Sequence, residues 1–244
     1  MNLYGLIGFP LTHSFSKKYF SDKFQKENIV DSKYELFEIK EVSQMLEIVK
    51  EHADLKGLNV TIPYKESVLP FLHEIDPSAM QIGAVNVIKI NNGRLKGFNS
   101  DYYGFRQSLM NFIGDTKNKK ALLLGTGGAS KAVSATLHDL EISCNFVSRK
   151  GGQNIFSYEE LDENIISAYQ LIINTTPLGM YPKTETFPEI PYQYLSPEHF
   201  LFDLIYNPEE TTFMKKGKEK GAKVKNGLEM LHLQAEKAWE IWNS

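Results

Sequence analysis

The sequence predicts an α/β protein that is divided into two domains. Segments with strand-like and helix-like patterns alternate through the first half of the chain, and such alternation is typical of α/β folds. A second alternation begins after the segment DYYGFRQSLMNF, so we expect the boundary between the halves near Ser100. The length of 244 residues agrees with two domains, because single hydrophobic cores stop growing near ~250 residues.

The first half is expected to alternate strands and helices and to end in a hairpin. The run before Pro10 is apolar, KYELFEI alternates as a strand does, and the aromatic residues of FSKKYFSDKFQKEN have helical spacing. The dipeptide Asn92-Gly93 between two apolar runs is a strong hairpin signal. The expected strands are residues 2–10, 33–39, 55–61 and the two arms of 84–100, and the expected helices are 15–28 and 42–52.

The second half is expected to repeat this alternation. Residues 119–140 combine an apolar strand, a glycine turn and a helix. Further strands are expected within 142–149, 169–180, 199–208 and 222–226, with no clear helix between SRKGGQN and YQLIIN. The chain closes with an amphipathic helix, residues 227–242. Its apolar side is expected to contain Leu228, Leu231, Ala235, Ala238, Trp239 and Trp242.

Composition and charge are ordinary for a globular protein and disfavour several classes. Hydrophobic residues make up 42% and charged residues 23%, and 27 basic against 30 acidic residues give a net charge of -3. We see no basic stripe of the kind that binds nucleic acid, and expect the run MKKGKEKGAKVK to be a solvated helix end. No apolar stretch approaches the ~20 residues of a membrane helix. The scattered histidines have no metal-ligand spacing, so no metal is expected.

The cysteine content favours a reducing compartment. Cys144 is the single cysteine and cannot form an intrachain disulfide, so we expect the cytoplasm. Because it lies in the apolar run EISCNFV, a buried strand residue is favoured over a reactive thiol. The N-terminus shows no basic leader before an apolar core, so a signal peptide is not expected.

The segment LGTGGAS predicts a dinucleotide site. Gly125, Gly127 and Gly128 directly follow a buried strand and open a helix. Glycine permits a tight turn and a close approach of the backbone to a pyrophosphate, and the helix N-terminus offers free N–H groups. Any strand-to-helix turn favours glycine, but the complete strand–turn–helix context favours the dinucleotide interpretation. Ser130 stands where the third glycine of the fingerprint is usual.

The end of the next strand predicts which dinucleotide binds. An acidic residue there favours NAD, because it accepts a hydrogen bond from the ribose 2′-hydroxyl. This chain has Ser148, Arg149 and Lys150 instead, and two cations beside a hydroxyl suit a 2′-phosphate. An ordinary exposed turn could carry the same charges. With the glycine turn upstream, we predict NADP rather than NAD.

Polar residues at strand ends in the first half predict a site for a small acid rich in hydroxyl groups. Ser14 and Ser16 lie at a helix start, where one is expected to cap the helix and both to hold a carboxylate. Asn59 and Thr61 share one face of a strand, because side chains two residues apart point the same way. The full set is Ser14, Ser16, Asn59, Thr61, Asn86 and Asp101.

Lys65, in the segment NVTIPYKES, is predicted to be functional. We expect Pro63 to end a strand and a helix to begin near the lysine. The alternative is a surface lysine in the first turn of a helix, but a cation at that end opposes the helix dipole. A lysine displayed toward a ligand is therefore the favoured interpretation.

These motifs together resemble the shikimate dehydrogenase family. GFPLTHSFS, NVTIPYKE, IGAVNV, GFNSDYYGF, LGTGGAS, INTTPLGM and the late LQA occur in the family's order and spacing over nearly the whole chain. The resemblance implies a substrate-binding catalytic domain with a mostly parallel sheet, residues 1–100 plus 228–244. It implies a Rossmann-like NADP-binding domain over residues 101–227, with the C-terminal helix returning to the first domain.

The resemblance also implies a role for each site residue. Lys65 and Asp101 correspond to the family's catalytic pair. Tyr206 corresponds to a tyrosine that approaches the substrate from the cofactor domain. The implied substrate ligands are Ser14, Ser16, Asn59, Thr61, Asn86, Tyr206 and Gln234. The implied cofactor ligands are Gly125, Thr126, Gly127, Gly128, Ala129, Ser130, Ser148, Arg149, Lys150, Thr175, Leu204 and Gly227.

Some positions depart from the family's motifs. Val87 and Ser100 each stand where a threonine is usual, and Lys17 stands where a proline is usual. The segment SRK replaces the common asparagine–arginine–threonine, which bears on the choice of cofactor more than on the class of enzyme. The chain is also short for the family, so we expect trimmed loops in the cofactor domain.

The implied reaction is the reversible NADPH-dependent reduction of 3-dehydroshikimate to shikimate, a step of aromatic amino-acid biosynthesis. One alternative is a quinate/shikimate dehydrogenase that prefers NAD. Another is a non-catalytic protein that senses shikimate or quinate, which is expected to have lost one of the catalytic pair. The expected partner is the small-molecule substrate, without nucleic acid or membrane, and the chain is expected to be a monomer or a homodimer.

Overall fold

The computed structural model describes residues 1–11 and 14–244, and the chain packs as two compact units. Unit 1 contains Met1–Asp101 and Gln234–Ser244, and unit 2 contains Tyr102–Leu233. The chain passes from unit 1 to unit 2 within α4 (Ser100–Ile113) and returns within α8 (Leu228–Asn243). The α/β class and the return of the C-terminal helix to the first unit are confirmed.

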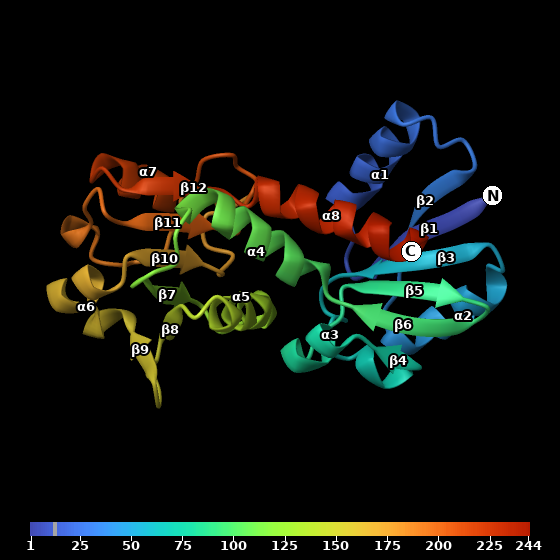
Figure 1. Ribbon diagram of the computed structural model, residues 1–244, viewed down its shortest axis with the longest axis horizontal. Helices are drawn as coiled ribbons and strands as arrows, with labels where there is room; N and C mark the ends of the chain where they lie inside the picture. The colour runs from blue at the N-terminus through green and yellow to red at the C-terminus, as the bar shows by residue number, and fades with distance from the viewer. Residues whose placement is uncertain (12–13) are drawn as a thin grey trace. The chain divides into compact units, whose positions relative to one another are not determined.

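Unit 1 is built on a six-stranded mixed sheet of order β2-β1-β3-β5-β6-β4 (Figure 1). The strands β2, β1 and β3 are parallel, whereas β5 runs antiparallel to both of its neighbours. The strands are β1 (Asn2–Gly8), β2 (Ser32–Glu38), β3 (Leu55–Val60), β4 (Glu74–Ile75), β5 (Val87–Asn91) and β6 (Arg94–Phe98). The helical elements are α1 (Phe15–Lys26), η1 (Val42–Gln44), α2 (Met45–Glu51), η2 (Leu69–Phe71) and α3 (Pro77–Ile82).

The two faces of the unit 1 sheet have different helical covers. Alternate residues of β1 point to opposite faces: Leu3 packs in one core with α2, and Tyr4 packs in another with α1 and α8. The second core is aromatic and centres on Trp242, which stacks on Tyr4 with ring centroids 4.9 Å apart. The Trp242 indole also donates a hydrogen bond to the carbonyl of Ile88, 3.1 Å away. The end of α8 is thus fixed to the sheet of unit 1.

Unit 2 is built on a six-stranded, all-parallel sheet of order β12-β11-β10-β7-β8-β9 (Figure 1). Its strands are β7 (Lys120–Leu124), β8 (Ser143–Ser148), β9 (Ile155–Ser157), β10 (Leu171–Asn174), β11 (Phe200–Asp203) and β12 (Lys223–Lys225). Its helical elements, besides α4 and α8, are α5 (Gly128–Asp139), η3 (Tyr158–Glu160), α6 (Glu163–Ala168), η4 (Tyr192–Tyr194) and α7 (Thr212–Glu219). The helices α4 and α5 cover one face, and α6 and α7 cover the other.

Several elements differ from the expectations. The hairpin is confirmed, with Asn92 and Gly93 both at positive φ between β5 and β6. The helix α6 was not expected; it is only a turn and a half long, and its sequence signal is the Asp162 side chain that caps it. The elements β4, α3 and β9 were also missed, because their short lengths give no measurable periodicity.

Leu228, expected on the apolar side of the last helix, and Cys144, expected to be buried, are both accessible to some degree. Leu228 is exposed at the start of α8, whereas Met230 in the same turn packs against the core of unit 2. Cys144 lies in β8 as expected, although it is only partly buried. Burial raises the pKa of its thiol, and a hydrogen bond with Ser134 opposes that rise. In residues 1–11 and 14–244, no helix has both the length and the apolar character needed to span a bilayer.

The packing of α8 on the sheet yields a stability prediction. A Cβ atom at Gly57 in β3 would lie 2.2 Å from the Trp242 ring, so Gly57→Ala forces the indole out of its place. We expect the substitution to lower the free energy of unfolding by about 1–3 kcal/mol, measured by chemical denaturation. The control is Gly152→Ala, whose Cβ would make an ordinary 3.8 Å contact with Ile155. Equal stabilities for the two variants would contradict the proposed packing.

Candidate functional site

The centre of the candidate site is an ion pair between Lys65 and Asp101. The Lys65 Nζ and Asp101 Oδ2 atoms lie 2.8 Å apart, although the two residues are separated by 36 positions in sequence. Both side chains are partly buried, with exposed fractions of 31% and 20%. A partly exposed amine and carboxylate in contact can hold and exchange a proton with a ligand that reaches them.

Backbone contacts on both sides fix the position of Lys65. Its carbonyl oxygen accepts a hydrogen bond from Val85 N at 2.7 Å. The preceding side chain, Tyr64, is buried, and its hydroxyl donates to the carbonyl of Ile39 at 2.6 Å. The expected helix start at Lys65 is wrong: the segment forms turns, followed by η2 at Leu69. The lysine is therefore held by these tertiary contacts and not by a helical first turn.

The start of α4 fixes the position of Asp101. The carboxylate lies in the first turn of the helix, where the positive end of the dipole stabilises a negative charge. The preceding residue, Ser100, donates its backbone N–H to Asn86 Oδ1 at 2.7 Å. The helix start is thus tied to the strand region that contains Asn86.

A polar network joins three of the other substrate ligands predicted in unit 1. Asn86 Nδ2 donates to Ser100 Oγ at 3.1 Å, and Ser100 Oγ donates to Gln234 Oε1 at 3.3 Å. Asn59 Nδ2 donates to the carbonyl of Asn86 at 3.3 Å. Three predicted ligands from β3, the segment before β5, and α8 therefore form one connected set. Ser100, which joins two of them, is fully buried beside the ion pair.

Thr61 and the two serines complete the predicted set in unit 1. Thr61 directly follows β3, and its N–H donates to the carbonyl of Ile7 at 3.0 Å. Ser14 caps α1 by accepting a hydrogen bond from Lys17 N at 3.4 Å, so the expected capping is confirmed. Ser16 lies in the first turn of α1. Thr12 and His13 of the motif GFPLTHSFS lie outside the described residues.

The glycine turn of unit 2 has two glycines with different structural requirements. Gly125 has a φ of +104°, which L side chains rarely adopt, and a Cβ there would lie 2.8 Å from Thr176. Gly127 is the N-cap of α5 with ordinary extended backbone angles, and a Cβ there would meet no atom within 4 Å. Of these two positions, the fold alone therefore requires glycine at 125. Open space in front of a helix N-terminus fits a bound phosphate group.

The remaining residues of the turn either face outward or support it. Thr126, Gly128 and Ala129 are exposed, whereas Ser130 is buried. The Ser130 hydroxyl donates to the carbonyl of Gly127 at 2.6 Å. Ser130 thus stabilises the turn through this hydrogen bond, at the position where the fingerprint usually has glycine.

The predicted 2′-phosphate residues lie at the end of β8. Ser148 is the last residue of the strand and is partly buried, and Arg149 and Lys150 follow it with exposed side chains. Burial raises the pKa of the nearby Tyr158, and the charge of Arg149 opposes this rise. The positive charge of Arg149 therefore acts on Tyr158. The side chains of Arg149 and Lys150 are both accessible to a ligand.

Other predicted residues of unit 2 lie at the carboxyl ends of its strands. Thr175 follows β10, and its hydroxyl donates to the carbonyl of Leu124 at 2.8 Å. Leu204 follows β11, and a Cβ atom at Gly227 would lie only 2.1 Å from its carbonyl oxygen. Tyr206, also after β11, is partly exposed, and burial raises the pKa of its hydroxyl. In parallel sheets, ligands bind at this edge.

Asn174 and Asp203, two polar residues that the sequence analysis did not identify, hold these loops together. Asp203, at the end of β11, is fully buried and accepts hydrogen bonds from Asn174 Nδ2 at 3.0 Å and Thr211 Oγ1 at 2.6 Å. Burial raises the pKa of Asp203 to about 6, and the bonds from Thr211, the backbone N–H of Ile205, and Asn174 oppose this. A polar residue at the end of each apolar run, LIIN and FLFD, is the sequence signal that could have revealed them.

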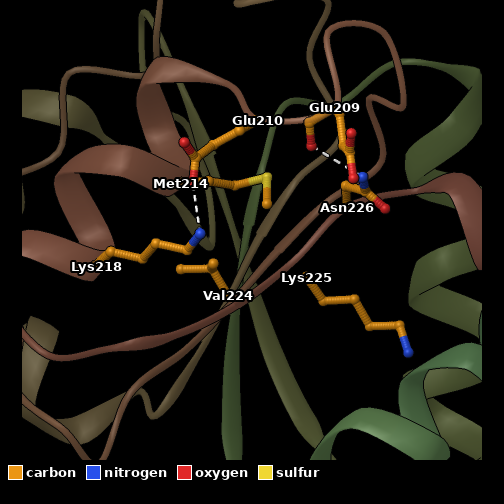
Figure 2. A pocket seen from close by; sticks show the side chains of 7 residues that line it. All are labelled: Glu209, Glu210, Met214, Lys218, Val224, Lys225 and Asn226. Atoms are coloured by element: carbon orange, nitrogen blue, oxygen red, sulfur yellow. Dashed lines mark hydrogen bonds and ion pairs between the residues drawn. The ribbon is translucent and has the colours of Figure 1, made fainter.

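A separate hollow of about 540 Å³ in unit 2 contains none of the predicted site residues. Figure 2 shows Lys218 reaching Glu210 from α7, and Asn226 hydrogen-bonded to the backbone of Glu209. Lys225 also lines the hollow and forms an ion pair with Glu229. Both lysines of this hollow are already paired within the protein, so it offers no excess positive charge to a ligand.

Comparisons with known proteins agree with this geometry. A sequence model of the shikimate dehydrogenase substrate binding domain matches residues 6–88. The protein named Shikimate dehydrogenase (NADP(+)) of Clostridium beijerinckii is 42% identical over 254 residues, which cover 99% of this chain and 92% of the relative. The chain belongs to the shikimate dehydrogenase family.

Solved structures of family members have the same fold. The shikimate 5-dehydrogenase of Thermus thermophilus, solved in complex with NADP(H) and shikimate, has a TM-score of 0.85 at 30% identity, covering 99% of this chain and 93% of that one. A chorismate mutase/shikimate 5-dehydrogenase fusion protein of Clostridium acetobutylicum has a TM-score of 0.89 at 39% identity, covering 100% of this chain and 91% of that one. The Rossmann-like fold expected for unit 2 is confirmed.

The contrast between Gly125 and Gly127 yields a prediction. Serine is a preferred N-cap residue, so Gly127→Ser is expected to leave the thermal unfolding midpoint unchanged or slightly higher. Its side chain would nevertheless occupy the space before the helix, so we expect the Kd for NADPH to rise on the order of tenfold, measured by fluorescence titration. Gly125→Ala is expected to lower the unfolding midpoint instead, because of the backbone strain. An unchanged Kd in Gly127→Ser would refute a phosphate site at this turn.

Proposed function

We propose that this protein is an NADP-dependent shikimate dehydrogenase, which reversibly reduces the 3-ketone of 3-dehydroshikimate to the alcohol of shikimate. The observation that carries the proposal is the 2.8 Å pair of Lys65 and Asp101 beside the connected amides of unit 1. A partly buried amine and carboxylate with hydroxyl-binding amides suit a polar cyclic acid whose one hydroxyl is oxidised. The names of the full-length relatives support the same activity.

In the proposed mechanism, Lys65 supplies the proton. Negative charge develops on the carbonyl oxygen as the ketone is reduced, and the Lys65 ammonium stabilises this charge and donates a proton to the oxygen. In the reverse direction, the neutral amine accepts the proton from the C3 hydroxyl. Asp101 accepts a hydrogen bond from Lys65 and orients the amine. Its remaining acceptor capacity serves the substrate hydroxyl.

The other polar residues of unit 1 are proposed to orient the substrate ring. Ser14 and Ser16 each have a hydroxyl that can donate to the carboxylate, near the positive end of the α1 dipole. Asn59, Asn86 and Thr61 have donors and acceptors for the ring hydroxyls. The roles of Gln234, in the network of Ser100, and of Tyr206, from unit 2, follow the family's motifs and stay predictions.

Unit 2 is proposed to hold NADP. Gly125–Ser130 would contact its diphosphate, Ser148–Lys150 its 2′-phosphate, and Thr175, Leu204 and Gly227 its nicotinamide end. The open space at Gly127 supports this fit. When bound, NADPH supplies the hydride. The protein is proposed to act in aromatic amino-acid biosynthesis in the cytoplasm, with residues 1–100 plus 228–244 as substrate domain and 101–227 as cofactor domain.

The proposed function is tested by initial rates at the nicotinamide absorbance band, with shikimate or quinate and with NADP or NAD. We expect the highest kcat/KM for shikimate with NADP. Better turnover of quinate or NAD would favour the quinate/shikimate alternative. No turnover in any combination, with binding of shikimate retained, would favour a sensing protein, although such a protein is expected to have lost Lys65 or Asp101.

The basic end of β8 yields a prediction on cofactor choice. The double variant Arg149→Ala/Lys150→Ala is expected to raise the KM for NADP at least about tenfold, because charge-assisted hydrogen bonds to the 2′-phosphate are lost. The KM for NAD, which has no 2′-phosphate, is expected to stay within about twofold. Lys218→Ala removes an exposed cation of the same unit and serves as the control. Equal rises in the KM for NADP and the KM for NAD would show that Arg149 and Lys150 do not bind the 2′-phosphate.

The ion pair yields a prediction on turnover. Lys65→Ala is expected to lower kcat by about 10²–10⁴-fold, the usual range for a lost general acid, while the KM for shikimate changes little. The control is Lys96→Ala, which removes an ion-paired lysine from β6 of the same unit. Near-normal turnover in Lys65→Ala would remove the lysine from the mechanism.

A further inference from the structure

Tyr34 is a buried tyrosine whose hydroxyl points at the candidate substrate site. It lies in β2, is 3% exposed, and donates a hydrogen bond to Asn59 Oδ1 at 2.7 Å. A hydroxyl in such surroundings needs partners, because an unpaired buried polar group is costly. Its partner is the side chain of Asn59, a predicted substrate ligand, and not a backbone group. The hydroxyl can therefore influence the orientation of that ligand.

Burial also keeps the Tyr34 hydroxyl protonated. Burial raises the pKa of Tyr34, because the interior solvates a phenolate poorly. The hydroxyl is therefore a hydrogen-bond donor, in agreement with its bond to the amide oxygen of Asn59 near the end of β3.

These contacts determine which atoms Asn59 can offer to a ligand. The amide oxygen accepts from Tyr34, and one amide hydrogen is donated to the carbonyl of Asn86 at 3.3 Å. An amide nitrogen has two hydrogens, so one donor remains. Rotating the amide by 180° would place its oxygen against the carbonyl of Asn86. The amide is therefore held in the orientation that presents an N–H donor.

The aromatic ring of Tyr34 is held independently of its hydroxyl. It stacks on Phe20 of α1, with ring centroids 4.7 Å apart and an angle of 15° between the planes. Phe20 is fully buried, and Trp242 packs at 6.4 Å from the Tyr34 ring. A phenylalanine at position 34 can keep this stack, so the hydroxyl can be removed with little change in packing.

We infer that Tyr34 is a positioning residue for the substrate, whose hydroxyl aligns the side-chain amide of Asn59. This inference rests on the proposed function, because it assigns shikimate as the ligand that the aligned amide contacts. Tyr34 does not touch the reacting carbon in this account. Its loss should therefore weaken substrate binding more than turnover.

The test is Tyr34→Phe, with Tyr192→Phe as the matched control. Tyr192 is also buried, and its hydroxyl donates to the carbonyl of Pro188 at 2.7 Å, within unit 2. We expect Tyr34→Phe to raise the KM and the calorimetric Kd for shikimate about tenfold. We expect kcat and the KM for NADP to stay within about twofold. Tyr192→Phe is expected to change the thermal midpoint by a similar amount and to leave the KM for shikimate unchanged.

A double-mutant cycle with Asn59→Ala separates alignment from general stability. If Tyr34 acts through Asn59, adding Tyr34→Phe to Asn59→Ala should raise the Kd for shikimate less than it does in the wild type. Additive effects of Tyr34→Phe and Asn59→Ala on the free energy of shikimate binding would overturn the inference but not the proposed function. An unchanged Kd for shikimate in a folded Tyr34→Phe protein would do the same. A wild-type protein that neither binds nor oxidises shikimate would overturn the proposed function, and the inference with it.

Discussion

The ion pair of Lys65 and Asp101 is the interaction on which the account of unit 1 depends. Partial removal of two charges from water costs desolvation free energy, which is offset only by good geometry and further hydrogen bonds. The fold supplies the good geometry and the further hydrogen bonds. The backbone of Lys65 is bound to Val85, and the residue before Asp101 is bound to Asn86. Since positions 85 and 86 are consecutive, one short segment holds both partners of the ion pair in register.

The same segment extends the constraint to the rest of the candidate site. Asn86 reaches Ser100 with its side chain and accepts from Asn59 with its carbonyl oxygen. Ser100 in turn reaches Gln234 on the returning helix α8, and Tyr34 supports Asn59 from β2. The proposed substrate ligands on separate elements are therefore not independent, and a change at one buried hydroxyl is expected to move several of them. A connected polar network of this kind is rigid only if every member is satisfied.

Much of the fold could be predicted from the sequence, because its signals are local. The hairpin at Asn92-Gly93 and the strand–glycine–helix unit at Gly125–Gly128 need only a few neighbouring residues to be recognised. The pairing of Lys65 with Asp101 was foreseen through family motifs and not through any local pattern. Short elements such as β4 and α6 have no measurable periodicity, and the helix expected to begin near Lys65 is a run of turns instead.

The partners of the supporting residues could not be predicted in this way. Tyr34 has the sequence pattern of an ordinary strand aromatic. Asp203 is marked by its place at the end of the apolar run FLFD, but this pattern does not show which residues it contacts. Their partners Asn59 and Thr211 lie 25 and 8 positions away, so no spacing rule links them.

The most direct test of the central claim is a crystal structure of the protein with shikimate and NADP bound. The account predicts the C3 hydroxyl oxygen of shikimate within about 3.2 Å of both Lys65 Nζ and an Asp101 carboxylate oxygen, as hydrogen bonding requires. A C3 hydroxyl that faces away from both groups, with another side chain in hydrogen-bond contact with it, would contradict the account.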